Sequence, residues 1–483
     1  MNKKIIYYVL SNLFKILIFL FIFPIGISIY YREEPRIYIS FVIPVIILAI
    51  LAYKFSKENP EDHSFFSREG LVIVSLSWLL VSFFGALPFY LSGSIPNFAN
   101  AFFESVSGFT TTGASTLTDI EAMSKSIIFW RSFTHLVGGM GVLVLVLAIL
   151  PKGNNKALYI MRAEVPGPSV GKLVAKMSYN SRILYIIYLS ITGILIVLLM
   201  FGGMNFFDSC IHAFGTAGTG GFSSKNSSIA FYNSSYIHYV LSFGMLAFGL
   251  NFNLFYLLLL GNIRQVLKSE ETKYYLFFIF GSTSLICFNL YKTYSSVFDM
   301  IRDVFFTVSS VITTTGYSTV NFGDWPLFSQ VILLFLMFIG GCAGSTAGGF
   351  KVARVVIVLK KVLKEFKKIG HPNKVINLKL DDKPVDKDMT DGVSTYFLLY
   401  VTTFCILLLI VSLETNSFLT AFSAIAATFN NIGPGLDAVG PTYNFYNFSS
   451  PMKYILSLGM LLGRLEIIPL LILISPRIYK HID

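Results

Sequence analysis

Charged residues are scarce in this chain. Aspartate, glutamate, lysine and arginine together make up 13% of its 483 residues, against 54% hydrophobic residues and a mean hydropathy of +0.68. Ordinary soluble domains carry about 25% charged residues, so this composition excludes an ordinary soluble domain. Long apolar runs separated by short polar segments indicate instead a protein that crosses a membrane several times.

Cysteine and histidine are also rare. The four cysteines, Cys210, Cys287, Cys342 and Cys405, lie in apolar surroundings without CxxC spacing, so we interpret them as small hydrophobic residues rather than disulfide or metal partners. A membrane enzyme would need His, Asp, Glu or Cys gathered near one membrane face, and no such cluster stands out among the six histidines. We therefore expect no enzymatic activity and no organic cofactor.

The net charge of +11 is distributed unevenly. On a soluble protein it would suggest nucleic acid as a partner, but here the cations lie mainly between the apolar runs. Residues 151–182 hold six basic residues against the single acid Glu164, and residues 351–392 hold eleven against six acids. Because Lys and Arg mark cytoplasmic loops, we place both linkers in the cytoplasm and expect no nucleic-acid partner.

The apolar runs predict two spans followed by eight more. Lys3 and Lys4 resemble the start of a signal peptide, but the run that follows, 5–30, is too long for one and is interpreted as a span. It forms a hairpin with residues 37–53. The other spans form four pairs: 70–91 with 126–150, 183–201 with 235–261, 276–294 with 327–342, and 393–413 with 452–475.

These spans divide the chain into five parts. The N-terminal transmembrane hairpin occupies 1–69, and the four units occupy 70–182, 183–275, 276–392 and 393–483. The first and third units each end in a basic linker. An even number of spans places both termini on the side of these linkers, which is the cytoplasm.

One short motif recurs between the two spans of every unit. It reads TTTGAS at 110–115, TGGFS at 219–223 and TTTGYS at 313–318, with a degenerate copy NNIGPG at 430–435. Single copies would suit ordinary turns. Four copies in register, each flanked by two spans, favour a common structural role and place Gly113, Gly221, Gly316 and Gly433 at equivalent positions.

The segments that lead into these motifs are apolar but too short to cross a bilayer. Phe98–Phe109 is one example. Such a segment can enter the membrane from outside and return as extended chain only if it lines a cavity or is buried in protein. A ring of backbone carbonyls can replace the hydration shell of an ion, and glycine tolerates the backbone angles that turn those carbonyls inward. We therefore predict an all-α polytopic membrane protein in which the hairpin precedes four helix–re-entrant loop–helix repeats around a central pore.

The whole chain resembles the TrkH/TrkG subunits of bacterial Trk potassium uptake systems, within the superfamily that includes KtrB and plant HKT proteins. The similar segments are GFTTTGA at 108–114, RAEVPGP at 162–168, TGGFS at 219–223, GGCAGSTAGG at 340–349 and GRLEI at 463–467. The resemblance implies that the residues at and just before each glycine coordinate potassium. These are Thr111, Thr112, Gly113, Thr219, Gly220, Gly221, Thr314, Thr315, Gly316, Asn431, Ile432 and Gly433.

All four glycines are present, as in the potassium-selective members. The fourth loop departs from the pattern because it lacks threonines. The resemblance also implies a homodimer in the bacterial inner membrane, in contact with lipid and with a TrkA-type cytosolic nucleotide-binding subunit.

Residues 340–349 carry five glycines in ten positions. So many glycines would weaken a lipid-facing helix, so we expect this segment to be unwound inside the bundle, below the filter. A phosphate-binding loop is disfavoured because Phe350 separates Gly349 from Lys351 and no strand precedes it. By resemblance the segment is an intramembrane gate. The gate residues are Gly340, Gly341, Gly344, Ser345, Thr346, Gly348, Gly349 and Arg464.

Arg464 lies deep in the last predicted span. A charge at that depth is costly and normally meets a partner or a cavity. It could form a structural pair with Glu466 or with another helix; by resemblance, it projects toward the pore and stabilises the closed gate.

After the gate, six apolar residues share one helical face and five lysines accumulate toward its end. They are Val352, Val355, Val356, Leu359, Leu363 and Phe366, with Lys360, Lys361, Lys364, Lys367 and Lys368. Such a helix usually rests on anionic headgroups. By resemblance, it is also a surface for the regulatory subunit.

Two transport mechanisms fit these features. The first is channel-like potassium uptake, and the alternative is a symporter coupled to protons or sodium. Coupling often leaves carboxylates in mid-span, and few lie there, so the sequence favours the channel.

Overall fold

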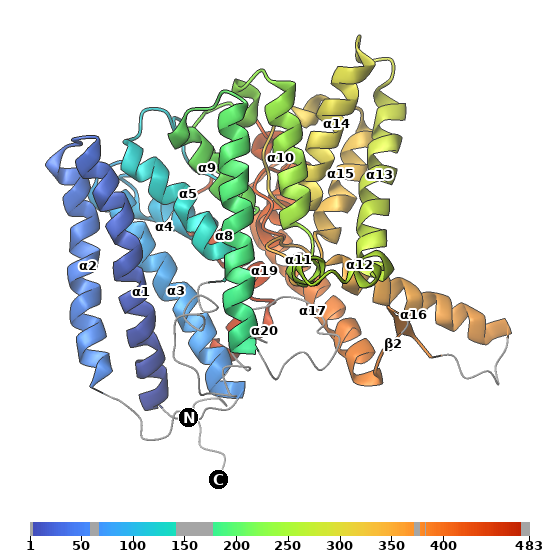
Figure 1. Ribbon diagram of the computed structural model, residues 1–483, viewed down its shortest axis with the longest axis horizontal. Coiled ribbons are helices and arrows are strands. Elements are labelled where there is room, and N and C mark those ends of the chain that lie inside the picture. Colours follow the sequence, from blue (N-terminus) through green and yellow to red (C-terminus); the bar gives the residue numbers. More distant parts are fainter. Residues whose placement is uncertain (1–2, 58–66, 142–176, 371–376, 382, 475–483) are drawn as a thin grey trace.

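The structure is almost entirely helical. It is a computed structural model that describes residues 3–57, 67–141, 177–370, 377–381 and 383–474. Within these ranges β-structure is confined to one antiparallel pair, β1 (Lys379–Leu380) with β2 (Lys383–Pro384). The expected all-α class is confirmed, and most helices stand side by side in one bundle (Figure 1).

The N-terminal hairpin consists of α1 (Lys3–Tyr30) and α2 (Pro35–Ser56). Pro35 begins α2, where a proline costs no helical hydrogen bond. One face of the hairpin packs on the bundle, since Phe21 stacks on Trp130 with ring centroids 4.5 Å apart. The other face leaves apolar side chains open, with Phe19 57% exposed, as suits a surface that meets lipid.

Each later unit contains a helix, a short helix and a second helix. The elements are α3 (Ser67–Leu91), α4 (Phe98–Phe109) and α5 (Lys125–Gly139); α8 (Met177–Phe201), α9 (Phe206–Ala217) and α10 (Ser235–Phe248); α13 (Glu270–Leu290), α14 (Val297–Ile312) and α15 (Leu327–Ile339); and α17 (Lys387–Val411), α18 (Phe418–Phe429) and α19 (Ser450–Arg464). We call α4, α9, α14 and α18 the half-span helices.

All four half-span helices start in the same way. Asn97, Asn205, Ser296 and Ser417 occupy the N-caps, and each side chain accepts a hydrogen bond from a backbone N–H of the first turn. These are the residue types that best satisfy the free donors of a helix start. The motif loops follow the C-terminal ends of these four helices.

The half-span helices are linked in a closed order. The second helix of each unit packs on the half-span helix of the next: α5 on α9, α10 on α14, and α15 on α18. The circle is completed by α19, which packs on α4 of the first unit. The four motif loops are thereby brought to one axis.

The expected spans differ in length and continuity. Among the described residues, five helices are long and apolar enough to cross a membrane, namely α1, α2, α3, α8 and α17, or six if α10 and α11 (Phe252–Leu259) count as one bent span. The expected spans that contain α15 and α19 are shorter, with helices of 13 and 15 residues.

Two expected spans are interrupted, which corrects the prediction of continuous helices over 235–261 and 452–475. The first consists of α10 and α11, bent by 92°, and is followed by α12 (Ile263–Lys268). The second ends as α19 at Arg464 and resumes as α20 (Ile468–Ile474). Between them Glu466 and Ile467 have φ of 59° and 68°, outside the helical range.

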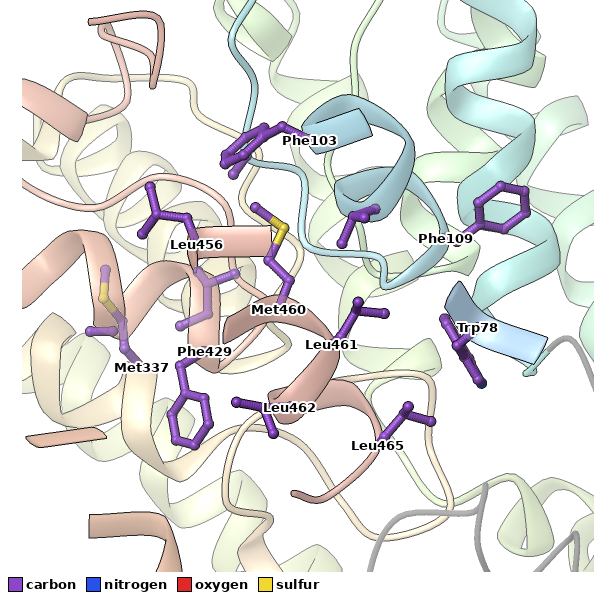
Figure 2. Packing of buried hydrophobic residues seen from close by; sticks show 14 of the residues in the cluster. Trp78, Phe103, Phe109, Met337, Phe429, Leu456, Met460, Leu461, Leu462 and Leu465 are labelled. Atoms are coloured by element: carbon purple, nitrogen blue, oxygen red, sulfur yellow. The ribbon is translucent and has the colours of Figure 1, made fainter. Parts of the chain in front are cut away.

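The core of the bundle is organised around α19. Figure 2 shows Leu461 of this helix directed toward Trp78 of α3, while Leu462 lies on the side of Phe429 of α18. These four side chains are each at most 6% exposed. A helix that is buried on several sides is usually apolar on those sides. Arg464, the charged residue at the end of α19, therefore needs a partner inside the bundle.

One helix leaves the bundle. α16 (Val352–Gly370) extends sideways from its lower part (Figure 1). Its first turns are buried at Val352 and Val356, whereas Leu363 and Phe366 farther along are 56% and 67% exposed. The predicted apolar face is therefore partly covered and partly open.

Several sequence predictions fall on residues 142–176. They include the end of span 126–150, most of the first basic linker and the RAEVPGP segment at 162–168, and all of these lie outside the described residues.

Trp130 provides a test of how the hairpin is attached. Its indole Nε1 donates to the Gly85 carbonyl at 3.0 Å while its ring stacks on Phe21. We expect Trp130→Ala to lower the free energy of unfolding by about 3–5 kcal/mol because a buried aromatic is replaced by a cavity. Phe19→Ala, on the exposed face of α1, should change it by less than about 1 kcal/mol. Thermal unfolding in detergent would measure both, and equal effects would contradict this packing.

Candidate functional site

The four half-span helices end in one shared backbone pattern. The N–H groups of Thr112, Gly220, Thr315 and Ile432 donate to the carbonyls five residues earlier, each at 2.8 Å. In each loop the residue before it has φ of 54° to 57°, and the N–H of that residue donates to the carbonyl three residues earlier. This pair of bonds is the Schellman motif that closes many helices.

The left-handed residue of that motif is unusual. Glycine normally occupies it, but here it is Thr111, Thr219, Thr314 or Asn431. A threonine in the left-handed region is strained, by about 1–2 kcal/mol, and such strain concentrates at functional sites. Three copies in equivalent loops indicate that the side chain itself is needed there.

A second left-handed residue follows two positions later, and here it is always glycine. Gly113, Gly221, Gly316 and Gly433 have φ of 78°, 75°, 82° and 101°. Each also lies against the carbonyl of a neighbouring loop. A methyl group on Gly113 would overlap the Gly220 carbonyl, one on Gly221 the Thr315 carbonyl, and one on Gly316 the Ile432 carbonyl. Gly433 completes the circle, since its methyl would lie 2.8 Å from the Thr112 carbonyl oxygen.

The four loops therefore form a closed ring. All four glycines line one cavity of about 100 Å³, which we call the outer cavity, together with Arg131, Tyr443 and Asn444 among others. The predicted residues Thr111 to Gly113, Thr219 to Gly221, Thr314 to Gly316 and Asn431 to Gly433 are thus brought together. Their carbonyls present oxygen ligands of the kind that replace water around an alkali cation.

The side chains of the ring are less symmetric than its backbone. Thr110 and Thr112 share a hydroxyl hydrogen bond of 2.8 Å in the first loop, and Thr313 and Thr315 repeat it in the third. The second and fourth loops lack this pair. In the fourth, the Asn431 amide donates to the Thr112 hydroxyl at 2.8 Å and to the Met460 carbonyl at 2.9 Å.

Hydroxyl groups also support the loops from behind. Ser107 donates to the Ala114 carbonyl at 2.6 Å, and Ser310 donates to the equivalent Tyr317 carbonyl at 2.7 Å. The Tyr317 hydroxyl lies 3.0 Å and 3.2 Å from the His212 and Phe222 carbonyl oxygens, so the third loop is tied to the second.

Residues 340–349 lie directly beneath the ring. α15 ends at Ile339 and α16 begins at Val352, so the glycine-rich segment is not helical, and Gly340, Gly344 and Gly349 have positive φ. Its Gly348 N–H donates to the Thr314 hydroxyl at 2.6 Å. The segment therefore touches the inner side of the third motif loop.

The same segment docks on the break between α10 and α11. Cys342 N–H donates to the Gly249 carbonyl at 3.0 Å, and the Thr346 hydroxyl donates to the Phe248 carbonyl at 3.2 Å. In return the Phe252 N–H donates to the Gly344 carbonyl at 3.1 Å. The two interrupted segments satisfy each other's free backbone groups, as buried non-helical chain requires.

Arg464 contacts the glycine-rich segment. Its guanidinium donates to the Thr346 carbonyl at 2.8 Å and to the carbonyls of Gly138 and Gly139 at 2.7 Å each. The side chain is buried, at 8% exposure. Arg464 thus connects the end of α19, the glycine-rich segment and the end of α5 through three carbonyls.

Glu466 has a different partner from the one considered from sequence. Its carboxylate accepts from Arg354 of α16 at 2.6 Å, and the Arg354 guanidinium lies 4.0 Å above the Tyr396 ring centroid. The beginning of α16 is therefore fixed to the break between α19 and α20.

Outside the ring, polar side chains join the ends of the first and second loops. The Asn226 amide donates to Asp119 at 2.9 Å, a bond that lowers the pKa of that carboxyl, and Lys225 lies 3.5 Å from Glu121. Across the parts of the chain that the structure describes, no three His, Cys, Asp or Glu residues are grouped to hold a metal ion.

The predictions from sequence did not include the buried ion pair between Glu104 of α4 and Arg131 of α5, whose atoms lie 3.0 Å apart. An isolated acid in an apolar half-span and an isolated base in an apolar span were its only signals. The predictions also did not include Gly138 and Gly463, where a methyl group would overlap the carbonyls of Phe109 and Phe429 at the ends of α4 and α18.

These features define a class: helical membrane proteins in which short helices end in loops that meet on one axis. Residues 33–479 match the model of the TrkH family, described as cation transport protein. The chain belongs to this family.

Several relatives match nearly the whole chain. It is 36% identical over 450 residues to the Trk system potassium uptake protein TrkH of Escherichia coli K12, covering 92% of each chain. It is 30% identical over 459 residues to TrkG of the same strain, covering 94% of this chain and 93% of that one. The crystal structure of the potassium transporter TrkH from Vibrio parahaemolyticus matches with a TM-score of 0.89 and 32% identity, covering 99% of this chain and 100% of that one.

The ring geometry predicts a strong effect at Gly221. Gly221→Ala should lower the free energy of unfolding by more than about 2 kcal/mol, because alanine is strained at φ 75° and its methyl meets the Thr315 carbonyl. Gly281→Ala is the matched control, because nothing lies within 4 Å of that site on α13, and it should be neutral or stabilising by up to about 1 kcal/mol. Thermal unfolding in detergent would compare them; a tolerated Gly221→Ala would contradict the close approach of the loops.

Proposed function

We propose that this protein takes up potassium across the bacterial inner membrane through a channel-like pore. Membership of the TrkH family and the names of the relatives support the transported ion. The single observation that carries the mechanism is the ring of four glycines and four carbonyls around one axis. On this proposal the segments 70–182, 183–275, 276–392 and 393–483 are four pore repeats, and potassium is the ion bound in the filter.

Electrostatics favours a cation in this ring. Each half-span helix ends at a motif loop, so four helix C-termini converge on the axis. A helix C-terminus carries a partial negative charge of about half an elementary charge. Together with the carbonyl oxygens, these ends stabilise a dehydrated cation without a formal negative charge that would hold it too tightly.

We assign the gate to the glycine-rich segment 340–349 and Arg464. The segment lies against Thr314 on the inner side of the ring, where it would block an ion that leaves the filter. Arg464 fixes it by donating to the Thr346 carbonyl, and a cation at this point would also repel potassium. The gate opens, on this proposal, when those carbonyl contacts are released.

α16 gives the gate a connection to the cytoplasm. It directly follows the glycine-rich segment and carries the exposed apolar residues Leu363 and Phe366 next to its lysines. We propose that this helix rests on lipid headgroups and receives a TrkA-type cytosolic nucleotide-binding subunit. The protein is further proposed to act as a homodimer with both termini in the cytoplasm.

Three of the buried acids favour conduction over coupled symport. Glu104 is paired with Arg131, Asp303 with Arg302, and the Glu271 carboxylate accepts from two backbone N–H groups. A coupling site needs a carboxylate free to exchange protons or sodium. These three are engaged in structural bonds.

Ion flux into liposomes tests the filter. With the purified protein alone, we expect flux of potassium and rubidium to exceed that of sodium and lithium about tenfold or more. Gly113→Ser should weaken this discrimination about tenfold, because the side chain would overlap the Gly220 carbonyl and open the ring. Gly281→Ser, at an open site, is the control. Potassium flux that requires an inward proton or sodium gradient would support the symporter instead.

Resting leak tests the gate. Arg464→Ala, and separately deletion of Gly344 and Ser345, should each raise potassium leak about tenfold, because the contacts that hold the glycine-rich segment are lost. Arg36→Ala is the control, since Arg36 is exposed and donates to the Leu91 carbonyl far from the ring. Unchanged leak in both gate variants would show that the segment does not close the pore.

A further inference from the structure

A buried ion pair joins the first two motif loops just beyond their glycines. Glu104 of α4 and Arg131 of α5 are 0% and 2% exposed, and the Arg131 Nε lies 3.0 Å from a Glu104 carboxylate oxygen. A charged pair is costly to bury unless its remaining polar atoms are also bonded. The other contacts of this pair therefore show what it holds in place.

The Glu104 end holds the first loop. Its second carboxylate oxygen accepts from the Ser115 hydroxyl and the Thr116 N–H, each at 2.6 Å. The Arg131 end holds the second loop: one nitrogen donates to the Ser223 carbonyl at 3.3 Å, and the guanidinium lies 3.5 Å above the Phe222 ring centroid. Ser115 and Ser223 are equivalent, each two residues after its ring glycine.

The other half-span helices do not repeat the acid. The position of Glu104 is taken by His212, Thr307 and Ala424 in the next three units. His212 also reaches its own loop, with a ring nitrogen 2.9 Å from the Ser223 hydroxyl oxygen. The charged pair is thus placed at one edge of the ring, between the first and second loops.

We propose that Glu104 and Arg131 are positioning residues for ion selectivity, and that their ion pair sets the spacing between the first and second filter loops. This inference rests on the proposed potassium filter. Discrimination between alkali cations requires carbonyls at fixed separations, and the pair bonds to backbone immediately beyond Gly113 and Gly221 on either side of one edge. Arg131 also lines the outer cavity, so Glu104 neutralises a cation that would otherwise repel entering potassium.

The decisive variant removes both charges together, because removing one alone leaves the other buried and unpaired. In liposomes, Glu104→Gln/Arg131→Met should lower the rubidium-to-sodium flux ratio at least tenfold, while total cation flux stays within about threefold. Arg131→Lys keeps the charge but cannot pair, stack and reach Ser223 at once, so it should lower the ratio about threefold. Loss of packing alone would lower the amount of folded protein, not this ratio.

The control is the ion pair between Asp299 and Arg302 at the start of α14, whose atoms lie 2.7 Å apart. It also lies on a half-span helix but at the end away from the ring, and Arg302 stays paired with the buried Asp303, so Asp299→Asn should keep the wild-type ratio. Should the decisive variant fail to give monodisperse protein, the rubidium-to-sodium flux ratios of Arg131→Lys and Ser115→Ala decide whether the pair positions the loops.

The outcomes separate this inference from the proposed function. Selective wild-type flux with a lowered ratio in the Glu104 and Arg131 variants supports both. Selective wild-type flux with unchanged ratios in those variants overturns the positioning role alone. Unselective or absent wild-type flux overturns the potassium filter, and this inference with it.

Discussion

The contact between each ring glycine and the carbonyl of the neighbouring loop constrains much of the structure. At Gly113, Gly221 and Gly316 a single added methyl group would overlap an oxygen atom, so the four loops can close only with these residues and these backbone angles. The half-span helices must then end in the same way, with strained residues such as Thr111 in the left-handed region. The surrounding helices must also approach closely, which explains Gly138 and Gly463.

A second constraint is that buried backbone must find partners. Below the ring, three stretches leave helical geometry: the α10–α11 break, residues 340–349 and the α19–α20 break. Each would be costly alone in an apolar interior. The first two bond to each other, and Arg464 at the third supplies donors to carbonyls of Thr346 and Gly138. The irregular segments are therefore mutually dependent, so a change in one alters the bonding of the others.

Local patterns predicted the parts of the fold that depend on local physics. The half-span Phe98–Phe109 coincides with α4 because a capping asparagine and a terminating Schellman turn fix both ends. The break near Gly249 lies in a run that hydropathy predicts as one span, and its partner is the distant Cys342, whose N–H donates to the freed Gly249 carbonyl. Glu104 and Arg131 are 27 residues apart in sequence and became a pair only through the packing of α4 against α5. Hydrophobic periodicity carries no information about such partners.

The ring is assembled from one chain, and this has a consequence for how it can change. In a filter built from four identical subunits, any substitution alters all four sides at once. Here the backbone is nearly four-fold, but the hydroxyl pairs occur only at Thr110 with Thr112 and Thr313 with Thr315. A single codon change therefore alters one quarter of the ring and leaves three quarters intact. On the proposed function, selection can adjust the preference for an ion in small steps, one loop at a time.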